Sequence, residues 1–318
     1  GGAPVNTEIS DALRGMDPVS YFAAGTPATG NFMITAVAAS RRAPFDYDGD
    51  DRTDLSIFRP AAGEWWYQRS STGIVSAGAF GTSTDKITPG DFTGDGRTDI
   101  AFWRPSTGEW YVLRSEDNSF FAFPFGSAGD IPVPADYDND TKTDAAVFRP
   151  STNTWFVLKS NGGGVDIYSF GTTGDKRVVG DYDGDNRTDI AIFRPSTGEW
   201  WVRRSSNGSV FVVTFGTMTD RPVQGHYTAD NKVDHAFWRP STGEWFVLRS
   251  EDFSYAAAQF GASTDIPVPG DYDGDDRFDL AVFRPSGSNW FLLRSSAGLA
   301  IQQFGLSTDT PTPSAYVP

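Results

Sequence analysis

The 318-residue sequence contains no cysteine and only two histidines. Without cysteine the chain forms no disulfide framework, no thiolate metal site and no cysteine nucleophile. His226 and His235 have no nucleophile or zinc-ligand pattern beside them, which argues against a catalytic triad and a zinc site. The sequence has no run of eighteen apolar residues and no lysine-led signal peptide, so no transmembrane helix is expected.

Positive charge is also scarce. The chain has 41 acidic and 26 basic residues, which give a formal net charge of −15 at pH 7. A field of that sign argues against nucleic acid and anionic membrane surfaces as partners. Glycine and proline are abundant, with 34 and 20 residues, and aromatic residues make up 14% of the chain. This mixture is typical of many short strands joined by tight turns, so we expect an all-β protein.

An aspartate-rich loop of nine residues recurs six times, with a spacing of 45 residues. The copies lie at residues 46–54, 91–99, 136–144, 181–189, 226–234 and 271–279. A repeat of about 45 residues is the size of one four-stranded blade of a β-propeller. The period therefore predicts a propeller built from one repeated blade.

The fourth repeat shows the expected blade most clearly. Turn residues separate four strand-like segments, at 178–179, 189–194, 199–204 and 209–215. In the second segment, Ile190 and Ile192 point to one face and Ala191 and Phe193 to the other. Because both faces are apolar, the sheet must lie between neighbouring sheets, as a propeller blade does.

Three further motifs recur once in each repeat. A tryptophan in the third strand and a Phe-Gly pair after the fourth are expected in the core and in a turn. An Arg-Pro pair marks the end of the second strand, because proline cannot donate to a ladder. We expect this arginine to pair with an acidic loop of its own or the next blade. The tryptophans are Trp65, Trp110, Trp155, Trp200, Trp245 and Trp290, and the arginines are Arg59, Arg104, Arg149, Arg194, Arg239 and Arg284.

The strand that precedes each acidic loop occurs a seventh time, at residues 310–316, where Ala315 replaces the first aspartate. This spare strand favours six blades, with the C-terminal strand closing the first blade, because an open ring would expose strand edges. A seventh blade made from residues 1–45 and the C-terminus is the alternative. We accordingly divide the chain into a propeller over 41–318 and a non-repeat segment over 1–40. In that segment a short helix near Ile9 and a strand over 31–37 are expected.

The acidic loop has the composition of a calcium site. Calcium prefers six to eight oxygen ligands from carboxylates and backbone carbonyls, and the loop offers side chains at positions 1, 3, 5 and 9 and a carbonyl at position 7. The predicted side-chain ligands are Asp46, Asp48, Asp50 and Asp54; Asp91, Thr93, Asp95 and Asp99; Asp136, Asp138, Asp140 and Asp144; Asp181, Asp183, Asp185 and Asp189; and Asp271, Asp273, Asp275 and Asp279. The predicted carbonyl ligands belong to Arg52, Arg97, Lys142, Arg187 and Arg277. The fifth loop, with His226 and Thr228, has lost this pattern, and little or no calcium is expected there.

The acidic loop, the apolar strand, Phe-Arg-Pro and the closing Phe-Gly together resemble the FG-GAP/VCBS-type repeats of extracellular proteins. The resemblance covers residues 41–316 and recurs six times. It implies an extracellular or cell-surface calcium-binding β-propeller.

Two classes of function follow as alternatives, and neither is enzymatic. A glutamate in the motif Gly-Glu-Trp recurs in four repeats, which is typical of a scaffold rather than of a single catalytic group. The first alternative is a structural or adhesive module that binds other surface proteins or polymerises through residues 1–40. The second is a multivalent lectin that stacks glycans on exposed tryptophans, for which the candidates are Trp66, Trp103, Trp201 and Trp238.

Overall fold

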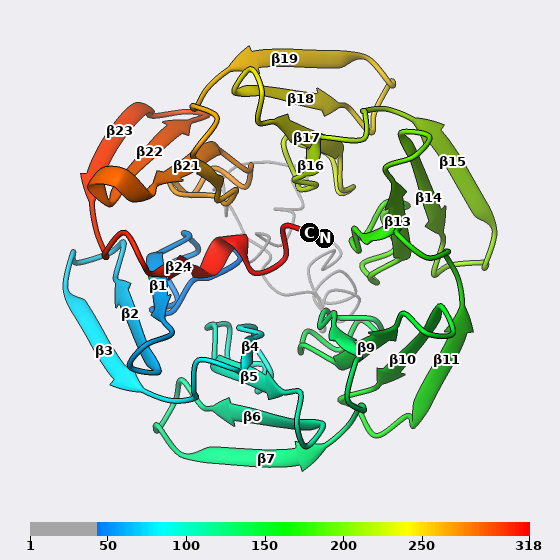
Figure 1. The fold of residues 1–318 in the computed structure, drawn as a ribbon, viewed down its shortest axis with the longest axis horizontal. Helices are drawn as coiled ribbons and strands as arrows, with labels where there is room; N and C mark the ends of the chain where they lie inside the picture. Colours follow the sequence, from blue (N-terminus) through cyan, green and yellow to red (C-terminus); the bar gives the residue numbers. More distant parts are fainter. Residues whose placement is uncertain (1–42) are drawn as a thin grey trace, which may run out of the picture. The chain divides into compact units, whose positions relative to one another are not determined.

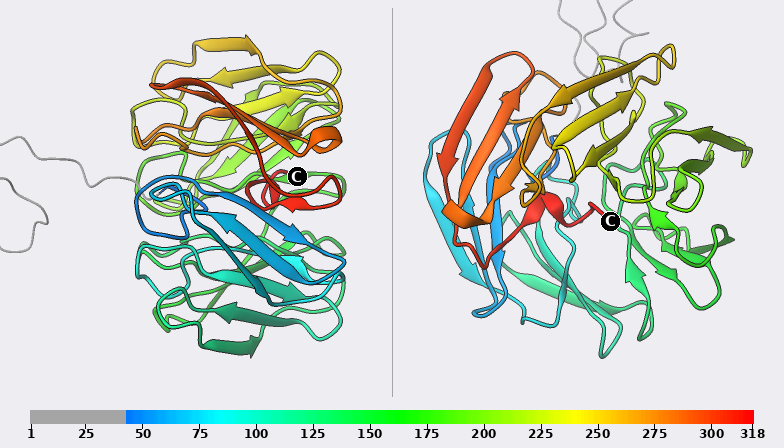
Figure 2. Two further views of the ribbon diagram at one scale, coloured as in Figure 1. Left: turned by 90° about the vertical axis from the view of Figure 1, so that its left-hand side faces the viewer. Right: turned by 45° about the horizontal axis from the view of Figure 1, so that its top comes forward.

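The computed structural model describes residues 43–318, which form six four-stranded antiparallel sheets arranged around a central axis (Figure 1). Figure 2 shows the same ring edge-on, with the sheets following one another like blades. The prediction of an all-β propeller with six blades is confirmed, and the described residues contain no seventh blade. The predicted helix near Ile9 and the predicted strand over 31–37 lie outside the described residues.

Every blade contains one very short inner strand and three longer strands. Blades one to three contain β1 (Leu55–Arg59), β2 (Glu64–Gln68) and β3 (Val75–Ala79); β4 (Lys86–Ile87), β5 (Ile100–Arg104), β6 (Glu109–Leu113) and β7 (Phe120–Pro124); and β8 (Ile131–Pro132), β9 (Ala145–Arg149), β10 (Thr154–Leu158) and β11 (Val165–Ser169). Blades four to six contain β12 (Lys176–Arg177), β13 (Ile190–Arg194), β14 (Glu199–Arg203) and β15 (Val210–Thr214); β16 (Arg221–Pro222), β17 (His235–Arg239), β18 (Glu244–Leu248) and β19 (Tyr255–Gln259); and β20 (Ile266–Pro267), β21 (Leu280–Arg284), β22 (Asn289–Arg294) and β23 (Gly298–Gln303). The remaining elements are β24 (Thr310–Pro311) and two 3₁₀ turns, η1 (Pro285–Gly287) and η2 (Thr312–Ser314).

The inner strand of the first blade comes from the C-terminal part of the chain. β24 pairs antiparallel with β1, with Phe58 opposite Thr310 and Ile57 opposite Pro311. Behind this pairing, the buried hydroxyl of Thr312 is hydrogen-bonded to Ser56 and lies 3.3 Å from the hydroxyl of Tyr47. The first and last repeats are therefore joined in one sheet, and the ring has no open strand edge at this point.

The second strand of each blade is buried on both faces, as its sequence predicts. In β13, Ile190 and Ile192 pack in one cluster with Trp155 of the preceding blade. Ala191 and Phe193 pack in a second cluster with Trp200 of their own blade. All six tryptophans of the third strands are at most 1% exposed, so their assignment to the core is confirmed.

Strand boundaries differ from the prediction mainly at the inner strand. We expected this strand at residues 178–179 of the fourth blade, whereas β12 spans Lys176–Arg177. Val178 continues the pairing through one hydrogen bond from its backbone N–H to the carbonyl of Ala191, and Gly180 forms an isolated bridge with Asp189. The backbone then turns into the acidic loop.

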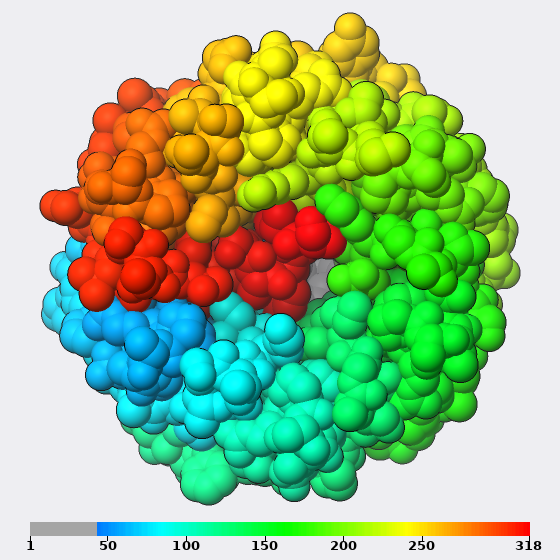
Figure 3. All heavy atoms as spheres, in the orientation of Figure 1, coloured from blue at the N-terminus to red at the C-terminus, as the bar shows by residue number. Residues whose placement is uncertain are grey.

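No helix within residues 43–318 has the length and apolar character needed to cross a bilayer. The inner strands surround the axis of the ring, and the segment after β24 turns into the centre. Figure 3 shows that this segment fills part of the central opening and leaves a gap beside it.

Candidate metal centre

In blades two to six the acidic loop connects the inner strand to the second strand, and in the first blade it leads into β1; its first aspartate organises the turn. In the fourth blade, Asp181 Oδ1 accepts hydrogen bonds from the backbone N–H groups of Gly184 and Asp185, at 2.7 and 3.2 Å. Asp181 Oδ2 accepts a third, from Asn186, at 2.8 Å. An aspartate side chain that captures the backbone N–H groups following it stabilises a tight turn. The backbone therefore curls around the carboxylate at position 1.

The aspartate at position 9 connects the loop to the rest of the blade. Asp189 is completely buried, and its Oδ2 accepts a hydrogen bond from the backbone of Tyr182 at 2.9 Å. Its Oδ1 accepts another from the backbone of Ser205 at 2.6 Å, at the start of the hairpin between β14 and β15. The same pair of contacts recurs in all six blades.

Serines of that hairpin also bind the aspartates at positions 3 and 5. Ser205 Oγ donates to Asp185 at 2.8 Å, and Ser206 Oγ donates to Asp183 Oδ2 at 2.5 Å. The side chains of the loop therefore converge under the hairpin, as the alternation of aspartates predicts.

One oxygen at position 3 is left without a partner in five of the six loops. These oxygens are shielded from solvent, and no group within residues 43–318 donates a hydrogen bond to them. They are Oδ1 of Asp48, Asp138, Asp183 and Asp273 and the hydroxyl of Thr93; Oδ2 of Asp138 also has no partner. Buried polar atoms in native proteins almost always have a partner, so a recurrent exception indicates a ligand that is not part of the chain.

The geometry of four loops brings three carboxylates together. In the third, fourth and sixth loops, oxygens from positions 1, 3 and 9 lie within 4.8 Å of one another; in the first loop the group comprises positions 1, 3 and 5. Oxygens at this separation can bind one cation together, because calcium–oxygen distances are about 2.3–2.6 Å. The residues present therefore fit calcium, and these four loops are the ones whose aspartates are complete in the sequence.

Within residues 43–318 no ion pair neutralises the charge of these carboxylates. Burial raises the pKa of Asp54 and of Asp279 to about 7, and the pKa of Asp189 to about 6, against the hydrogen bonds that lower them. Neighbouring aspartates of the same loop raise these pKa values further. A divalent cation would reverse this balance by stabilising the ionised form.

The loops also form a continuous ring of contacts between blades. The backbone N–H at position 8 of each loop donates to the position-1 carbonyl of the preceding blade, as Val233 does to Asp181 at 2.7 Å. The ring closes where Thr53 donates to Asp271 at 2.6 Å. Four loops have glycine at position 4, where it makes room for the next blade: a Cβ on Gly274, whose φ is +75°, would lie 3.0 Å from Arg52 Nε. A change that makes one loop more rigid should therefore also restrain the loops of the neighbouring blades.

The second and fifth loops differ from the other four, and from each other. Among residues 43–318, neither brings three carboxylates together in the way described above. The second loop keeps a buried hydroxyl without a partner, on Thr93. In the fifth loop the corresponding hydroxyl, on Thr228, is hydrogen-bonded to Asp230 and Asp234 at 3.2 Å. The fifth loop thus satisfies its own polar groups.

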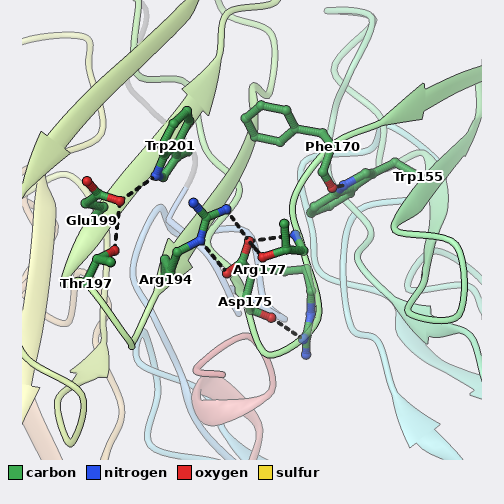
Figure 4. A network of polar contacts seen from close by, with 9 residues as sticks. Trp155, Phe170, Asp175, Arg177, Arg194, Thr197, Glu199 and Trp201 are labelled. Carbon is green, nitrogen blue, oxygen red and sulfur yellow. Dashed lines mark hydrogen bonds and ion pairs between the residues drawn. The ribbon is translucent and has the colours of Figure 1, made fainter.

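The prediction that the repeated arginine pairs with an acidic loop is wrong. Arg194 Nε and Nη2 bind the two carboxylate oxygens of Asp175, each at 3.0 Å (Figure 4). Asp175 also accepts the backbone N–H of Thr172 at 2.8 Å, so this pair, which we call the arginine clamp, holds the turn that leads into β12. Similar clamps join Arg59 to Asp309, Arg104 to Asp85, Arg149 to Asp130, Arg239 to Asp220 and Arg284 to Asp265. The aspartate of each clamp also recurs once per repeat, and this recurrence is the sequence signal that could have predicted the pair.

The prediction of four exposed tryptophans is also wrong for two of them. Trp103 and Trp238 are fully buried, because they occupy the position that phenylalanine holds in the other second strands, such as Phe193. Trp201 is half-buried; its ring lies 5.0 Å from the guanidinium of Arg194. Trp66 is held in the same way by Arg59. These rings are part of the framework around the arginine clamps.

His235 is buried in the space between blades four and five. Its ring contacts Tyr182, Trp200 and Phe211, and neither ring nitrogen has a hydrogen-bond partner. Burial lowers its pKa to about 3. Among residues 43–318 no set of metal ligands includes it, and the rings around it make it a polar substitution in an apolar layer.

Comparisons with known proteins identify the fold. No protein-family model matches the chain, and no curated protein matches it. A streptogramin B lyase structure aligns with a TM-score of 0.51 and 11% identity, over 80% of this chain and 84% of the other. A lectin from Agrocybe aegerita, described as recognising non-reducing terminal N-acetylglucosamine, aligns with a TM-score of 0.52 and 15% identity, over 83% and 78%. Virginiamycin B lyase from Staphylococcus aureus aligns with a TM-score of 0.50 and 10% identity, over 80% and 85%. These neighbours share the propeller and differ in activity, so the likeness concerns the fold alone.

Proposed function

We propose that this chain is a calcium-stabilised, non-enzymatic propeller of the FG-GAP/VCBS type that acts outside the cell or at its surface as a structural or adhesive module. Calcium would bind in the first, second, third, fourth and sixth loops, and the fifth would remain free of metal. Other surface proteins, or further copies of this chain, would be the partners. Residues 1–40 are the proposed arm for self-association into filaments or a surface layer.

The observation that carries this proposal is the oxygen without a partner at position 3. It recurs in the five loops whose sequences retain ligand residues, and it is absent from the fifth loop, where Thr228 is hydrogen-bonded internally. A structural explanation of the loop, such as a network of aspartate turns, would satisfy this oxygen in every copy. A cation ligand accounts for both the recurrence and the exception.

Calcium would act by bracing the blades. When bound, it would neutralise carboxylates that the protein leaves unpaired, and the binding free energy would add to the free energy of unfolding. The loops are joined to one another by the inter-blade hydrogen bonds, so each bound ion would restrain two neighbouring blades. In this role the site supplies rigidity and performs no chemistry.

Calcium titration of chelator-treated protein tests the proposal. We expect saturable heat in isothermal titration calorimetry, with a stoichiometry near five ions per chain and the weakest site in the second loop. Asp138→Asn and Asp273→Asn should each remove one site. Asp230→Asn, in the fifth loop, is the matched control and should leave the stoichiometry unchanged. Absence of calcium binding at millimolar concentration would contradict the proposal.

A lectin is the second candidate, because a polar cavity of about 270 Å³ opens between blades three and four. Tyr168 lines this cavity with the guanidinium of Arg203 at 4.6 Å from its ring, and Lys159 pairs with Asp166 at 2.8 Å. Charged and hydroxyl groups around such a cavity are suited to hydrogen bonds with the hydroxyls of a sugar. The lectin among the structural neighbours supports this candidate only through its fold.

Binding of N-acetylglucosamine distinguishes the two candidates. A lectin would bind this sugar in calorimetry and lose binding in Tyr168→Ala. A structural module would show no binding to the sugar or to a glycan array, and would assemble or bind protein instead. Electron microscopy of the full chain tests assembly, since uniformly monomeric particles would contradict the filament.

A further inference from the structure

A second feature of the ring, independent of calcium, is an apolar cavity on its central axis. The cavity measures about 280 Å³ and lies beside the C-terminal segment. Its walls are mainly apolar, with Val133, Val179 and Val223 from the residues that follow three inner strands and Tyr316 from the segment after β24. Ligand cavities typically range from about 300 to 1,000 Å³, so this one suits a small molecule.

Arg177 brings a charge into this apolar wall. The equivalent residues of the other inner strands are uncharged: Ile87, Pro132, Pro222, Pro267 and Pro311. With the described residues, Arg177 makes one hydrogen bond, from Nη1 to the carbonyl of Asp175 at 3.3 Å (Figure 4), and its Nε is buried without a partner among them. The nearby carboxylate of Asp175 is already bound by Arg194. A buried guanidinium without a carboxylate is costly, and burial lowers the pKa of Arg177 accordingly.

Other groups around Arg177 reinforce the positive charge. Burial lowers the pKa of Lys176, and the charges of Arg221 and Arg177 lower it further. Within residues 43–318 neither Lys176 nor Arg221 forms an ion pair with a carboxylate. Lys176 Nζ donates to the backbone carbonyl of Asp220 at 3.2 Å, while the Asp220 carboxylate is bound by Arg239. Gln224 lines the same cavity, and its side-chain oxygen is buried without a partner. The chain as a whole is strongly acidic, so this local excess of cations is a departure from its general composition.

We propose that the central cavity binds a small amphipathic carboxylate, whose anionic group pairs with Arg177 and whose apolar part lies against the valine and proline wall. The carboxylate would supply the counter-ion that residues 43–318 do not. An apolar body without charge would leave Arg177 unpaired, and a small inorganic anion would leave the wall uncovered. The proposed ligand therefore has both an anionic group and an apolar body.

Octanoate is a suitable probe. Its controls are 1-octanol, which keeps the apolar chain without the charge, and acetate, which keeps the carboxylate without the chain. Calorimetry on the full, calcium-saturated chain should show that octanoate binds more tightly than either. Arg177→Ile, which copies the residue of the second blade, should weaken octanoate binding about 10- to 100-fold, the usual range for losing a charged hydrogen bond. Lys86→Ile removes the same charge outside the cavity and should leave the affinity unchanged.

The unliganded stability of the same variants provides an independent readout. Arg177→Ile should raise the melting temperature without ligand, because it removes a buried charge that has no carboxylate partner. Arg177→Gln should weaken octanoate binding as Arg177→Ile does, and it covers the case in which isoleucine disturbs folding. The proposal is overturned if octanoate does not bind, if octanol binds equally well, or if both variants lose stability and keep their affinity.

Discussion

The two ends of each blade bury aspartate in opposite ways. At one end, the acidic loop collects carboxylates that accept backbone hydrogen bonds but have no cationic side chain bound to them, as with Asp189. At the other end, the arginine clamp gives Asp175 a guanidinium with two matched hydrogen bonds. Both aspartates are buried and both hold a turn. Only the second has its charge neutralised within the chain.

This difference separates the contacts that the chain stabilises by itself from the contacts whose stability depends on dissolved cations. The arginine clamp carries its own counter-ion, so its contribution should be insensitive to dissolved metal. The acidic loop leaves its charge to be neutralised from outside, so its contribution should follow the calcium concentration. The fifth blade is an internal control, because it keeps the clamp and has lost the metal pattern at the opposite end.

Chelation is expected to have the largest effect. Each site saturated at about 100 times its dissociation constant adds about 2.7 kcal/mol to the free energy of unfolding, and several sites act together. At about 2–4 °C per kcal/mol, EDTA should lower the melting temperature by more than about 10 °C. Differential scanning calorimetry with and without EDTA measures this, with magnesium as the control cation. An unchanged transition would remove the distinction between the two ends.

Breaking one arginine clamp should have the next largest effect. Asp175→Asn leaves Arg194 without its counter-ion, and removing one partner of a buried pair costs about 3–5 kcal/mol; the partial exposure of Arg194 places this case at the lower end. The loss should be the same in calcium and in EDTA, as measured by urea denaturation. A loss that appears only in calcium would show that the two ends are coupled.

The effect of removing one position-3 carboxylate on the free energy of unfolding should have opposite signs with and without calcium. In calcium, Asp183→Ala should lower the free energy of unfolding by about 2–3 kcal/mol through the loss of one site. In EDTA it should be neutral or stabilising, because it removes a buried oxygen without a partner. Thr228→Ala in the fifth loop serves as the control, and its effect should not depend on calcium.

His235→Leu should have the smallest effect, and it should be stabilising. The variant copies Leu55 of the first blade and removes two buried nitrogens without partners, for a gain of about 1–2 kcal/mol. The pKa of His235 is lowered to about 3, so the folded state does not take up the proton that the unfolded state binds near pH 6.5. The parent should therefore lose stability relative to the variant as the pH falls from about 6.5 towards 3. Parallel pH profiles of the two proteins would contradict this.

The sequence predicted the propeller because its signals were local and repeated. The period, the short turns and the second strand with two apolar faces each define the same blade, and the structure agrees. The acidic loop was also predictable in outline, since alternation places Asp183 and Asp185 under one hairpin.

The arginine clamp was missed because its partner lies across a turn, 19 residues earlier in the chain, where no pattern of alternation connects the two. The burial of Trp103 and Trp238 was missed because tryptophan there replaces phenylalanine, and only comparison of the six second strands reveals it. The oxygen without a partner at position 3 cannot be seen in a sequence at all, because it depends on which groups fail to reach it.

The pairing of β24 with β1 has a consequence for the order of folding during synthesis. The ribosome makes Phe58 long before Thr310, so the first blade remains three-stranded, with the edge of β1 uncovered, until nearly the whole repeat array has emerged. Closing so long a segment carries a large entropic cost, which makes this contact a late one. A circular permutant that begins between two blades and omits residues 1–40 would bring both strands of this pair close together in the sequence, and would allow every blade to be completed as it leaves the ribosome.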